Sequence, residues 1–243
     1  MTICSKVRQE KSKYVDCDYC AMQPVCLPLK TGKTEIAIMN SYLSKHNTIK
    51  ASNTLFEENE PVSTIYSVCS GCFKLTTISP EGKESVIGFR FPGEIIAEDV
   101  IHASHYRYNA VAIGNSSVCI IDVTELKECG KLIPELLLNI IALLSKQNST
   151  LREEFTSVVA KKTAESLLAA FIINMLQRNS PHQETITKLH LPVGRDVIAN
   201  HLGFRRETLS RILSKFQQQG LLSIKAKDID IFDLVALKKI ANS

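Results

Sequence analysis

The chain lacks any long apolar run. Its most apolar segment, residues 136–144, is interrupted by Asn139 and is far too short to span a bilayer, which needs roughly 20 apolar residues. Residues 1–14 are polar and mixed in charge, without the apolar stretch of a signal peptide. These absences predict a soluble, cytoplasmic protein.

The sequence also lacks tryptophan and the motifs of common enzymes. It contains no nucleophile elbow, P-loop or acid/base motif, so an enzyme is not expected. Eight cysteines in 243 residues are too few for a secreted disulfide scaffold. In a reducing cytosol, clustered cysteines more often bind a metal or sense redox state. Hydrophobic residues make up 44% of the chain, which is enough for a full buried core.

Three cysteines form a compact cluster near the start of the chain. Cys17, Cys20 and Cys26 have the spacing Cys-x2-Cys-x5-Cys, and Cys119 lies far away in the sequence. Two thiolates this close can bind one metal centre, a third can close the same face, and one more ligand must come from elsewhere in the fold. Thiolate ligation suits zinc or an iron–sulfur centre, and the spacing alone does not choose between them.

Two other groups of residues could carry redox or haem chemistry. Cys69 and Cys72 are also a Cys-x2-Cys pair, but they lie at an expected strand–turn–strand and not at the start of a helix. That position favours a packing role over dithiol chemistry. His102 and His105 could ligate haem, although histidines in a loop are usually solvated.

Between about residue 48 and residue 122, short apolar runs alternate with turn residues. This pattern is typical of a small antiparallel barrel or roll. The expected strands cover residues 65–68, 73–78, 85–89, 111–113 and 117–121.

Residues 134–160 predict one long helix with a coiled-coil seam. Apolar residues recur at alternating steps of four and three, which favours a parallel homodimer. Asn148 is the one polar residue in the seam, and a buried Asn tends to set the register. The alternative is a long helix packed on its own barrel. The seam consists of Leu137, Ile141, Leu144, Asn148, Leu151, Phe155 and Val158.

The C-terminal third predicts a partner that is a polyanion. Residues 161–243 contain 13 Lys and Arg against 7 Asp and Glu. Within it, residues 195–214 show a helix–turn–helix pattern, with Gly203 where the turn needs a positive φ. A two-strand wing with a basic tip follows, suited to phosphate contact. The second helix can lie in a major groove, where Arg binds guanine and Glu accepts from cytosine N4. The candidate DNA-binding residues are Arg206, Glu207, Ser210, Arg211 and Lys227.

With these motifs, the chain resembles the CRP/FNR family of bacterial transcription regulators over almost its whole length, and among them the FNR-type oxygen sensors most. The resemblance rests on the four spaced cysteines, on Leu168-Ala169-Ala170-Phe171-Ile172 and on Arg206-Glu207-Thr208-Leu209-Ser210-Arg211. It implies that Cys17, Cys20, Cys26 and Cys119 hold an oxygen-labile 4Fe–4S cluster. The cluster-bound protein would be the DNA-binding homodimer, and oxygen would convert the cluster to a 2Fe–2S form and release the dimer.

The resemblance also implies an operator and a contact with RNA polymerase. The family's Glu-x-x-Ser-Arg reader matches Glu207, Ser210 and Arg211, which implies inverted half-sites containing T-G-A. The hairpin that contains Gly82 is the candidate surface for RNA polymerase. Arg206 stands where FNR-type sensors usually have an apolar residue, and a bidentate guanidinium there favours G-T-G-A over, or alongside, T-T-G-A.

One departure concerns nucleotide binding. Pro92-Gly93-Glu94 keeps the Gly-Glu of the cyclic-AMP-binding branch, but the later Arg-Ser pair of that branch aligns with Tyr106-Arg107. A phosphate would then lose its bidentate anchor and a hydroxyl donor, so a nucleotide effector is disfavoured.

The expected fold is α+β and has four parts. Residues 1–35 form a cysteine-rich arm, residues 36–133 an antiparallel β-roll resembling a cyclic-nucleotide-binding domain, residues 134–160 the dimerisation helix, and residues 161–243 a winged helix–turn–helix. The expected function is oxygen-responsive, DNA-binding regulation of anaerobic genes. The alternatives are a zinc-stabilised regulator, a regulator that responds to haem or another ligand, and a dithiol redox protein.

Overall fold

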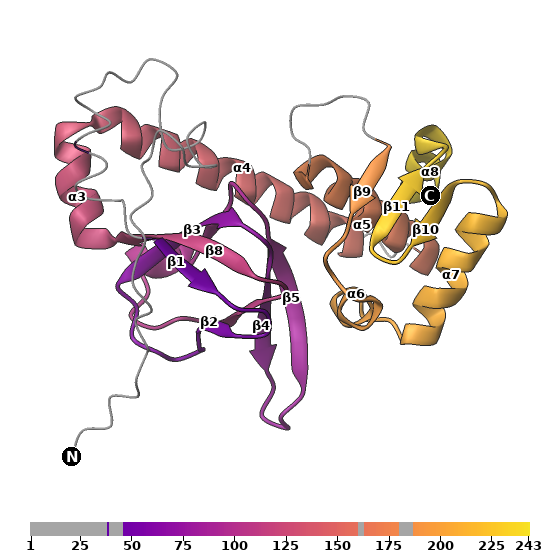
Figure 1. Ribbon diagram of the computed structural model, residues 1–243, viewed down its shortest axis with the longest axis horizontal. Coiled ribbons are helices and arrows are strands. Elements are labelled where there is room, and N and C mark those ends of the chain that lie inside the picture. Colours follow the sequence, from indigo (N-terminus) through magenta and orange to yellow (C-terminus); the bar gives the residue numbers. More distant parts are fainter. Residues whose placement is uncertain (1–37, 39–45, 160–162, 180–186) are drawn as a thin grey trace.

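The computed structural model describes residues 38, 46–159, 163–179 and 187–243 (Figure 1). A β-roll is followed by one long helix and then by a smaller helical domain with its own sheet. The strands are β1 (His46–Ile49), β2 (Thr54–Phe56), β3 (Thr64–Ser70), β4 (Phe73–Ile78), β5 (Glu84–Arg90), β6 (Ile95–Ile96), β7 (Asn109–Ala112), β8 (Ser116–Asp122), β9 (Lys188–His190), β10 (Leu222–Lys225) and β11 (Asp228–Ile231). The helices are η2 (Glu98–Ile101), α3 (Val123–Leu132), α4 (Pro134–Val159), α5 (Ala164–Asn179), α6 (Arg195–Leu202), α7 (Arg206–Gln218) and α8 (Leu234–Ala241).

The roll consists of two four-stranded antiparallel sheets, which confirms the predicted architecture. The first sheet has the strand order β1-β8-β3-β6 and the second the order β2-β7-β4-β5. The five predicted strands correspond to β3, β4, β5, β7 and β8. The remaining strands β1, β2 and β6 have only 4, 3 and 2 residues, too few for an apolar alternation to be visible in the sequence.

Three clusters of buried apolar residues hold the layers together. The first lies between the two sheets and includes Phe56, Phe73 and Val118. The second joins the outer face of the first sheet to α3 and α4; it contains Cys119 and is called the Cys119 cluster below. The third cluster, which includes Phe89, joins the second sheet to the C-terminal domain. It is called the interdomain cluster below. The roll therefore shares one buried core with α3 and α4 and another with the C-terminal domain.

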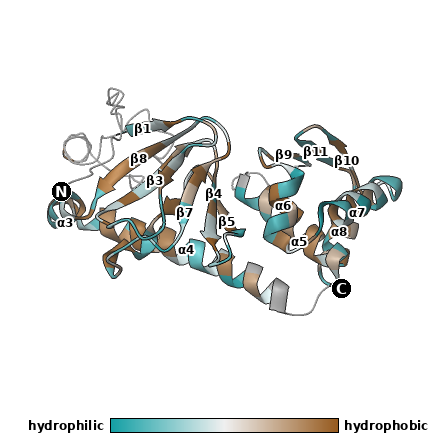
Figure 2. Cartoon of the chain, turned by 90° about the horizontal axis from the view of Figure 1, so that it is seen from below, coloured by the Kyte–Doolittle hydropathy of each residue, from teal (hydrophilic) through white to brown (hydrophobic). Residues whose placement is uncertain are grey.

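Helix α4 carries both hydrophobic and hydrophilic residues along its length (Figure 2), and its apolar residues divide between those that pack on the roll and those that stay exposed. Leu136 is buried at 1% exposure, and Ile140 and Leu143 pack beside it against the Cys119 cluster. Ile141 and Phe155 on the predicted seam remain 60% and 70% exposed. The seam as a whole is therefore not used for packing on its own barrel. Among the described residues, no helix has the length and apolarity needed to cross a membrane.

The other seam residues divide by burial. Leu137 and Leu151 are 37% and 38% exposed, Asn148 is also exposed, and Leu144 is partly buried at the edge of the Cys119 cluster. Val158 belongs to α4, but its side chain lies outside what the structure describes.

The C-terminal domain is a helix–turn–helix followed by the predicted two-strand wing, to which a third strand is added. Strands β10 and β11 form the expected hairpin, and β9 pairs with the free side of β11, with Leu189 opposite Ile229. Strand β9 is three residues long and only Leu189 in it is buried, so it carries no visible strand pattern.

Helix α6 lies against β5, the edge strand of the second sheet (Figure 1). The Asn200 side chain accepts a hydrogen bond from the backbone N–H of Val86 at 2.7 Å and donates one to the carbonyl oxygen of Glu84 at 3.0 Å. His201 Nδ1 lies 3.2 Å from the carbonyl oxygen of Val86, and its ring packs edge-on to Phe89 with centroids 5.0 Å apart. One carboxamide thus caps the open edge of the sheet as a neighbouring strand would.

We expect Asn200→Ala to lower the free energy of unfolding by about 1–2 kcal/mol, because two backbone groups of β5 lose their partner. Urea unfolding followed by circular dichroism measures this. Asn242→Ala, at the exposed end of α8, is the control and should change the free energy by less than about 0.5 kcal/mol. Equal effects of the two substitutions would show that the Asn200 contact contributes nothing.

Candidate functional site

The turn between α6 and α7 has the predicted geometry. Gly203 has φ 71, and its N–H donates to the carbonyl oxygens of Ala199 and Asn200, which ends α6. The positive φ predicted for this glycine is confirmed, since a side chain would be strained there. Helix α7 then begins at Arg206 and is anchored by Leu209, which is fully buried.

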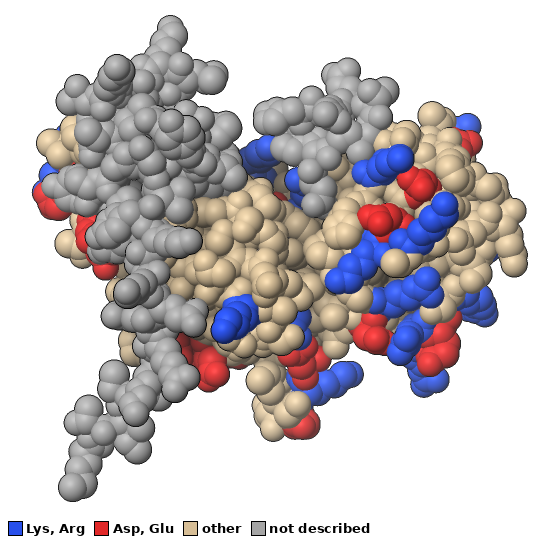
Figure 3. All heavy atoms as spheres, in the orientation of Figure 1, with Lys and Arg blue, Asp and Glu red and all other residues tan. Residues whose placement is uncertain are grey.

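The candidate DNA-reading residues lie on the outer side of this anchored helix. Arg206, Glu207 and Arg211 are exposed and Ser210 is half-buried. Lys227 is exposed at the two-residue turn between β10 and β11. Lys and Arg side chains gather over this domain with some acidic side chains among them (Figure 3). The structure thus brings the α7 residues together on one face, with the wing tip in the same domain.

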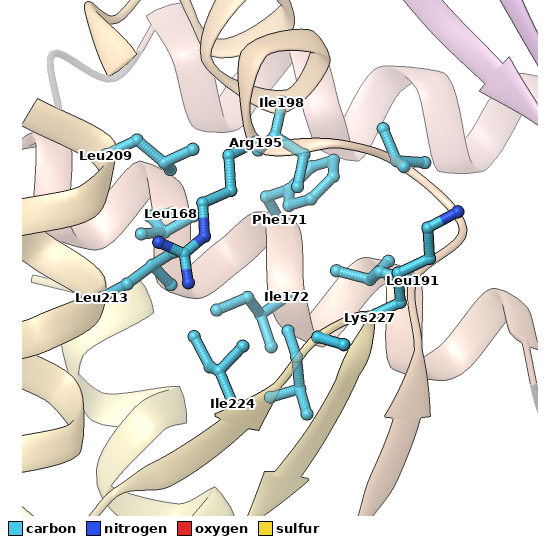
Figure 4. Close-up of a pocket in the computed structure, with 13 residues that line it drawn as sticks. Leu168, Phe171, Ile172, Leu191, Arg195, Ile198, Leu209, Leu213, Ile224 and Lys227 are labelled. Carbon is cyan, nitrogen blue, oxygen red and sulfur yellow. The ribbon is translucent and has the colours of Figure 1, made fainter. Parts of the chain in front are cut away.

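A narrow apolar crevice of about 40 Å³ opens between α5, α6, α7 and the wing (Figure 4). Arg195 and Lys227 are the charged residues that line it, and the Arg195 side chain extends across it toward Leu213. Pockets that hold small-molecule ligands have volumes of roughly 300 Å³ or more, so this crevice belongs to the packing of the domain.

Arg206 carries an ion pair that the sequence pattern does not show. Its Nε lies 3.3 Å from Oδ1 of Asp196 in the first turn of α6, and both side chains are about two-thirds exposed, at 65% and 66%. The two helices of the motif are therefore linked on the surface where the recognition residues lie.

Cys119 is the one predicted cluster ligand within the described residues; Cys17, Cys20 and Cys26 lie outside them. Cys119 is in β8, 7% exposed, with His46 of β1 and Ser67 of β3 as its cross-strand neighbours. The chain therefore enters the roll at His46, directly beside Cys119. Ile38 packs against the Cys119 cluster too. Within the described residues, no three His, Cys, Asp or Glu side chains form a metal site.

Cys69 and Cys72 do not form a dithiol site. Cys69 belongs to the Cys119 cluster, whereas Cys72 belongs to the interdomain cluster on the other sheet. Burial raises the pKa of the Cys72 thiol to about 12, against a smaller lowering by Arg178. Gly71 between them has φ 81, and a Cβ there would lie 2.2 Å from Ser116 Oγ. The packing interpretation of the pair is supported, because the two thiols face different cores.

The glutamate of the nucleotide-type motif is already engaged by the C-terminal domain. Arg178 of α5 binds Glu94 through two hydrogen bonds, from Nε at 2.8 Å and from Nη2 at 2.7 Å. Nη2 also donates to the carbonyl oxygen of Phe89 at 2.7 Å, and the guanidinium lies over the Phe91 ring, 4.9 Å from its centroid. Arg107, in the position of the missing Arg-Ser pair, is 67% exposed. The carboxylate of Glu94 is thus engaged within the chain, and a disfavoured nucleotide effector stays a prediction.

Two further side chains fill the region behind Glu94 with internal hydrogen bonds. The buried Arg90 donates to the carbonyl oxygens of Ile95 at 2.9 Å and Phe89 at 3.1 Å, and to Glu98 at 2.6 Å. Gln147 of α4 accepts from the Ile95 N–H at 2.6 Å and donates to the Ile95 carbonyl oxygen at 3.2 Å. Burial by itself lowers the pKa of Arg90, but the charges of Glu98, Tyr108 and Glu94, together with the hydrogen bond to Glu98, raise it by more. Arg90 is therefore satisfied by the protein itself.

The haem alternative receives no geometric support. His102 and His105 are both exposed, and His105 Nδ1 lies 3.0 Å from the hydroxyl of Ser104. These positions fit the solvated histidines that their loop predicts.

Both the N-terminal and the C-terminal half of the chain match known protein families. Residues 46–131 match the family model described as a cyclic nucleotide-binding domain, and residues 168–240 match the Crp-like helix-turn-helix domain. The chain is 31% identical to the anaerobic regulatory protein of Pasteurella multocida, over 94% of this chain and 84% of that one. It is 30% identical to the fumarate and nitrate reduction regulatory protein of Escherichia coli, over 93% and 90%.

Among solved structures, FixK2 from Bradyrhizobium japonicum is similar with a TM-score of 0.70 at 22% identity, covering 81% of this chain and 96% of that one. This similarity supports the fold.

We expect Lys227→Ala to weaken binding to all duplex sequences alike, because a lysine at the wing tip contacts phosphate and not a base edge. The slope of log affinity against log salt should fall by about one. Fluorescence anisotropy with specific and scrambled duplexes at several salt concentrations measures both. Lys238→Ala on α8 is the matched control. A loss confined to one sequence would contradict a phosphate contact.

Proposed function

The chain belongs to the CRP/FNR family of transcription regulators, and on that basis we propose that it regulates anaerobic genes in response to oxygen. In this proposal Cys17, Cys20, Cys26 and Cys119 hold a 4Fe–4S cluster, and the cluster-bound homodimer binds DNA. Membership of the family supports DNA binding and transcription regulation. The iron–sulfur cluster, the dimerisation switch and the operator sequence are what we propose.

The observation that carries the proposal is the position of Cys119. It lies in β8, next to the first strand of the roll, and is a buried member of an apolar cluster. A buried thiolate needs a cation to offset its charge, and four cysteine thiolates are the ligand set of a cubane iron–sulfur cluster. The donors and the apolar surroundings of Cys119 therefore fit such a cluster. When bound, it would supply the chemistry that reacts with oxygen.

The same apolar cluster connects Cys119 to the helix that would dimerise. Cys119, Leu126 of α3 and Leu136 of α4 belong to the Cys119 cluster, and Leu144 packs at its edge. Leu144 also lies on the seam. A shift of β8 is therefore transmitted to α4 through contacting side chains, because close-packed cores do not deform gradually. We expect two states of α4 whose populations depend on the cluster.

Dimerisation through the exposed seam completes the proposal. Ile141, Leu151 and Phe155 form an apolar stripe on the face of α4 that the roll leaves uncovered. A parallel pairing of two such helices would bury the stripe and place two copies of α7 about one helical turn of DNA apart. Each α7 would then read a half-site containing T-G-A through Glu207, Ser210 and Arg211.

We expect protein purified without oxygen to be brown, to contain iron and acid-labile sulfide, and to lose its colour in air. Cys119→Ala should abolish the chromophore. The control is Cys129→Ala, which also removes one thiol from the Cys119 cluster and should keep the chromophore. Both variants should lose similar stability, which thermal melting checks.

Metal analysis distinguishes the proposal from its main alternative. Stoichiometric zinc without acid-labile sulfide in the anaerobic protein would replace the oxygen sensor with a zinc-stabilised regulator.

We expect Leu151→Glu to give a cluster-bearing monomer that fails to bind the inverted repeat, because two carboxylates would face each other across the seam. Ala142→Glu is the control: Ala142 is exposed on α4 but off the seam. Analytical ultracentrifugation without oxygen measures the association state. A wild-type dimer that is equally stable with and without the cluster would reject dimerisation as the switch.

The β4–β5 hairpin is the proposed contact with RNA polymerase, and it projects from the body of the roll (Figure 1). Gly82 at its tip has φ 78, so Gly82→Ala strains the turn without meeting any neighbouring atom. We expect reduced transcription activation in a reconstituted assay, with unchanged DNA affinity. Gly114→Ala, which also meets no neighbouring atom, is the control. Parallel losses of activation and affinity would count against the contact.

A further inference from the structure

We propose that Asp196 is a specificity-determining residue that positions Arg206 for a guanine at the first base of the half-site. The proposal rests on the proposed function, namely that α7 enters the major groove. The DNA-reading residues that the resemblance implies all lie on α7 or the wing, whereas Asp196 belongs to α6 and contacts Arg206 through an ion pair.

Both partners of the ion pair are presented from fixed backbone. Asp196 is in the first turn of α6, where the helix N-terminus favours a carboxylate. Helix α6 is itself held by the burial of Ile198 and by the Asn200 contacts with β5. Arg206 is the first residue of α7, which Leu209 anchors in the core. The short side chain of Asp196 is therefore presented from a fixed backbone position to the longer side chain of Arg206.

The atoms used in the ion pair leave the reading atoms available. The contact joins Asp196 Oδ1 to Nε of Arg206, at 3.3 Å. Arginine has five N–H donors, and the four on the two Nη atoms remain for other partners. Guanine presents two acceptors, O6 and N7, that a guanidinium can bind with two parallel hydrogen bonds. Thymine presents one acceptor and a methyl group at the same place, and cannot satisfy that pair of donors.

Restraint of Arg206 is what converts this difference into selectivity. A free arginine on a DNA-facing helix can turn to a phosphate and bind every sequence alike. An arginine restrained by a carboxylate on α6 stays directed at the base edge. The same carboxylate repels the phosphates of any duplex. Asp196 is therefore expected to lower the affinity for every duplex and to raise the discrimination between G-T-G-A and T-T-G-A half-sites. A purely structural role does not produce this combination.

The test uses the full-length protein, purified without oxygen, and two duplexes that carry inverted G-T-G-A or T-T-G-A half-sites. Affinities are measured by fluorescence anisotropy for the wild type, Asp196→Asn, Arg206→Ala and the double variant. We expect the wild type to prefer the G-T-G-A duplex by roughly tenfold. Asp196→Asn should reduce that preference to less than about threefold, mainly by tighter binding to T-T-G-A.

Two controls separate positioning from charge and from folding. Asp228→Asn removes one carboxylate of equal exposure, 65%, from the wing and should leave the preference at the wild-type value. In the Arg206→Ala background, Asp196→Asn should leave the remaining preference unchanged, because the double-mutant cycle assigns the effect to the pair. Unchanged melting temperatures check that each variant is folded.

The outcomes distinguish this inference from the function on which it rests. An Asp196→Asn protein with the wild-type preference overturns the positioning role. Wild-type protein that requires T-G-A but binds both duplexes equally also overturns it, and leaves the proposed regulator intact. Wild-type protein that fails to distinguish T-G-A repeats from scrambled DNA overturns both.

Discussion

The packing of α4 on the first sheet is the interaction on which the remaining geometry depends. Leu136 and its neighbours use one face of the helix to close the apolar cluster that contains Cys119. The helix is long and carries apolar residues on two sides. Because the roll buries only one of them, the apolar residues on the other side stay exposed. That division presents Ile141 and Phe155 outward at a fixed angle to the roll.

A second constraint is the shared core between the second sheet and the C-terminal domain. Phe89 of β5 packs with Phe171 of α5, with ring centroids 6.1 Å apart, and both rings contact His201. Asn200 and Arg178 add directional hydrogen bonds to this apolar contact. The helix–turn–helix therefore has a defined orientation on the roll within one chain. Any change of that orientation must break these contacts together, which favours discrete states over gradual motion.

The sequence was sufficient for features that depend on local patterns. Short runs of strand-forming residues separated by turn residues predicted β3, β4 and β5, and the turn at Gly203 followed from the need for a positive φ. The long helix α4 followed from its heptad spacing, and dimerisation through that seam stays a prediction. What could not be predicted depends on contacts between distant segments. Asn200, Gln147 and Asp196 are polar residues on helices, and nothing in their local sequence distinguishes a side chain that meets a backbone or an arginine from one that meets water. Strand β9 exists because β11 has a free side, which is a property of the fold and not of three residues.

The Arg178–Glu94 ion pair has a consequence for the kinds of signal the protein can receive. In a domain built like a cyclic-nucleotide receptor, a partner for this glutamate is normally thought of as a diffusing molecule whose occupancy follows its concentration. Here the partner is a guanidinium on the same polypeptide, so its local concentration is set by the tether between the two domains and not by metabolism. While this ion pair is in place, Arg178 occupies both carboxylate oxygens of Glu94. Any ligand that needs this carboxylate must therefore first break a contact between the two domains.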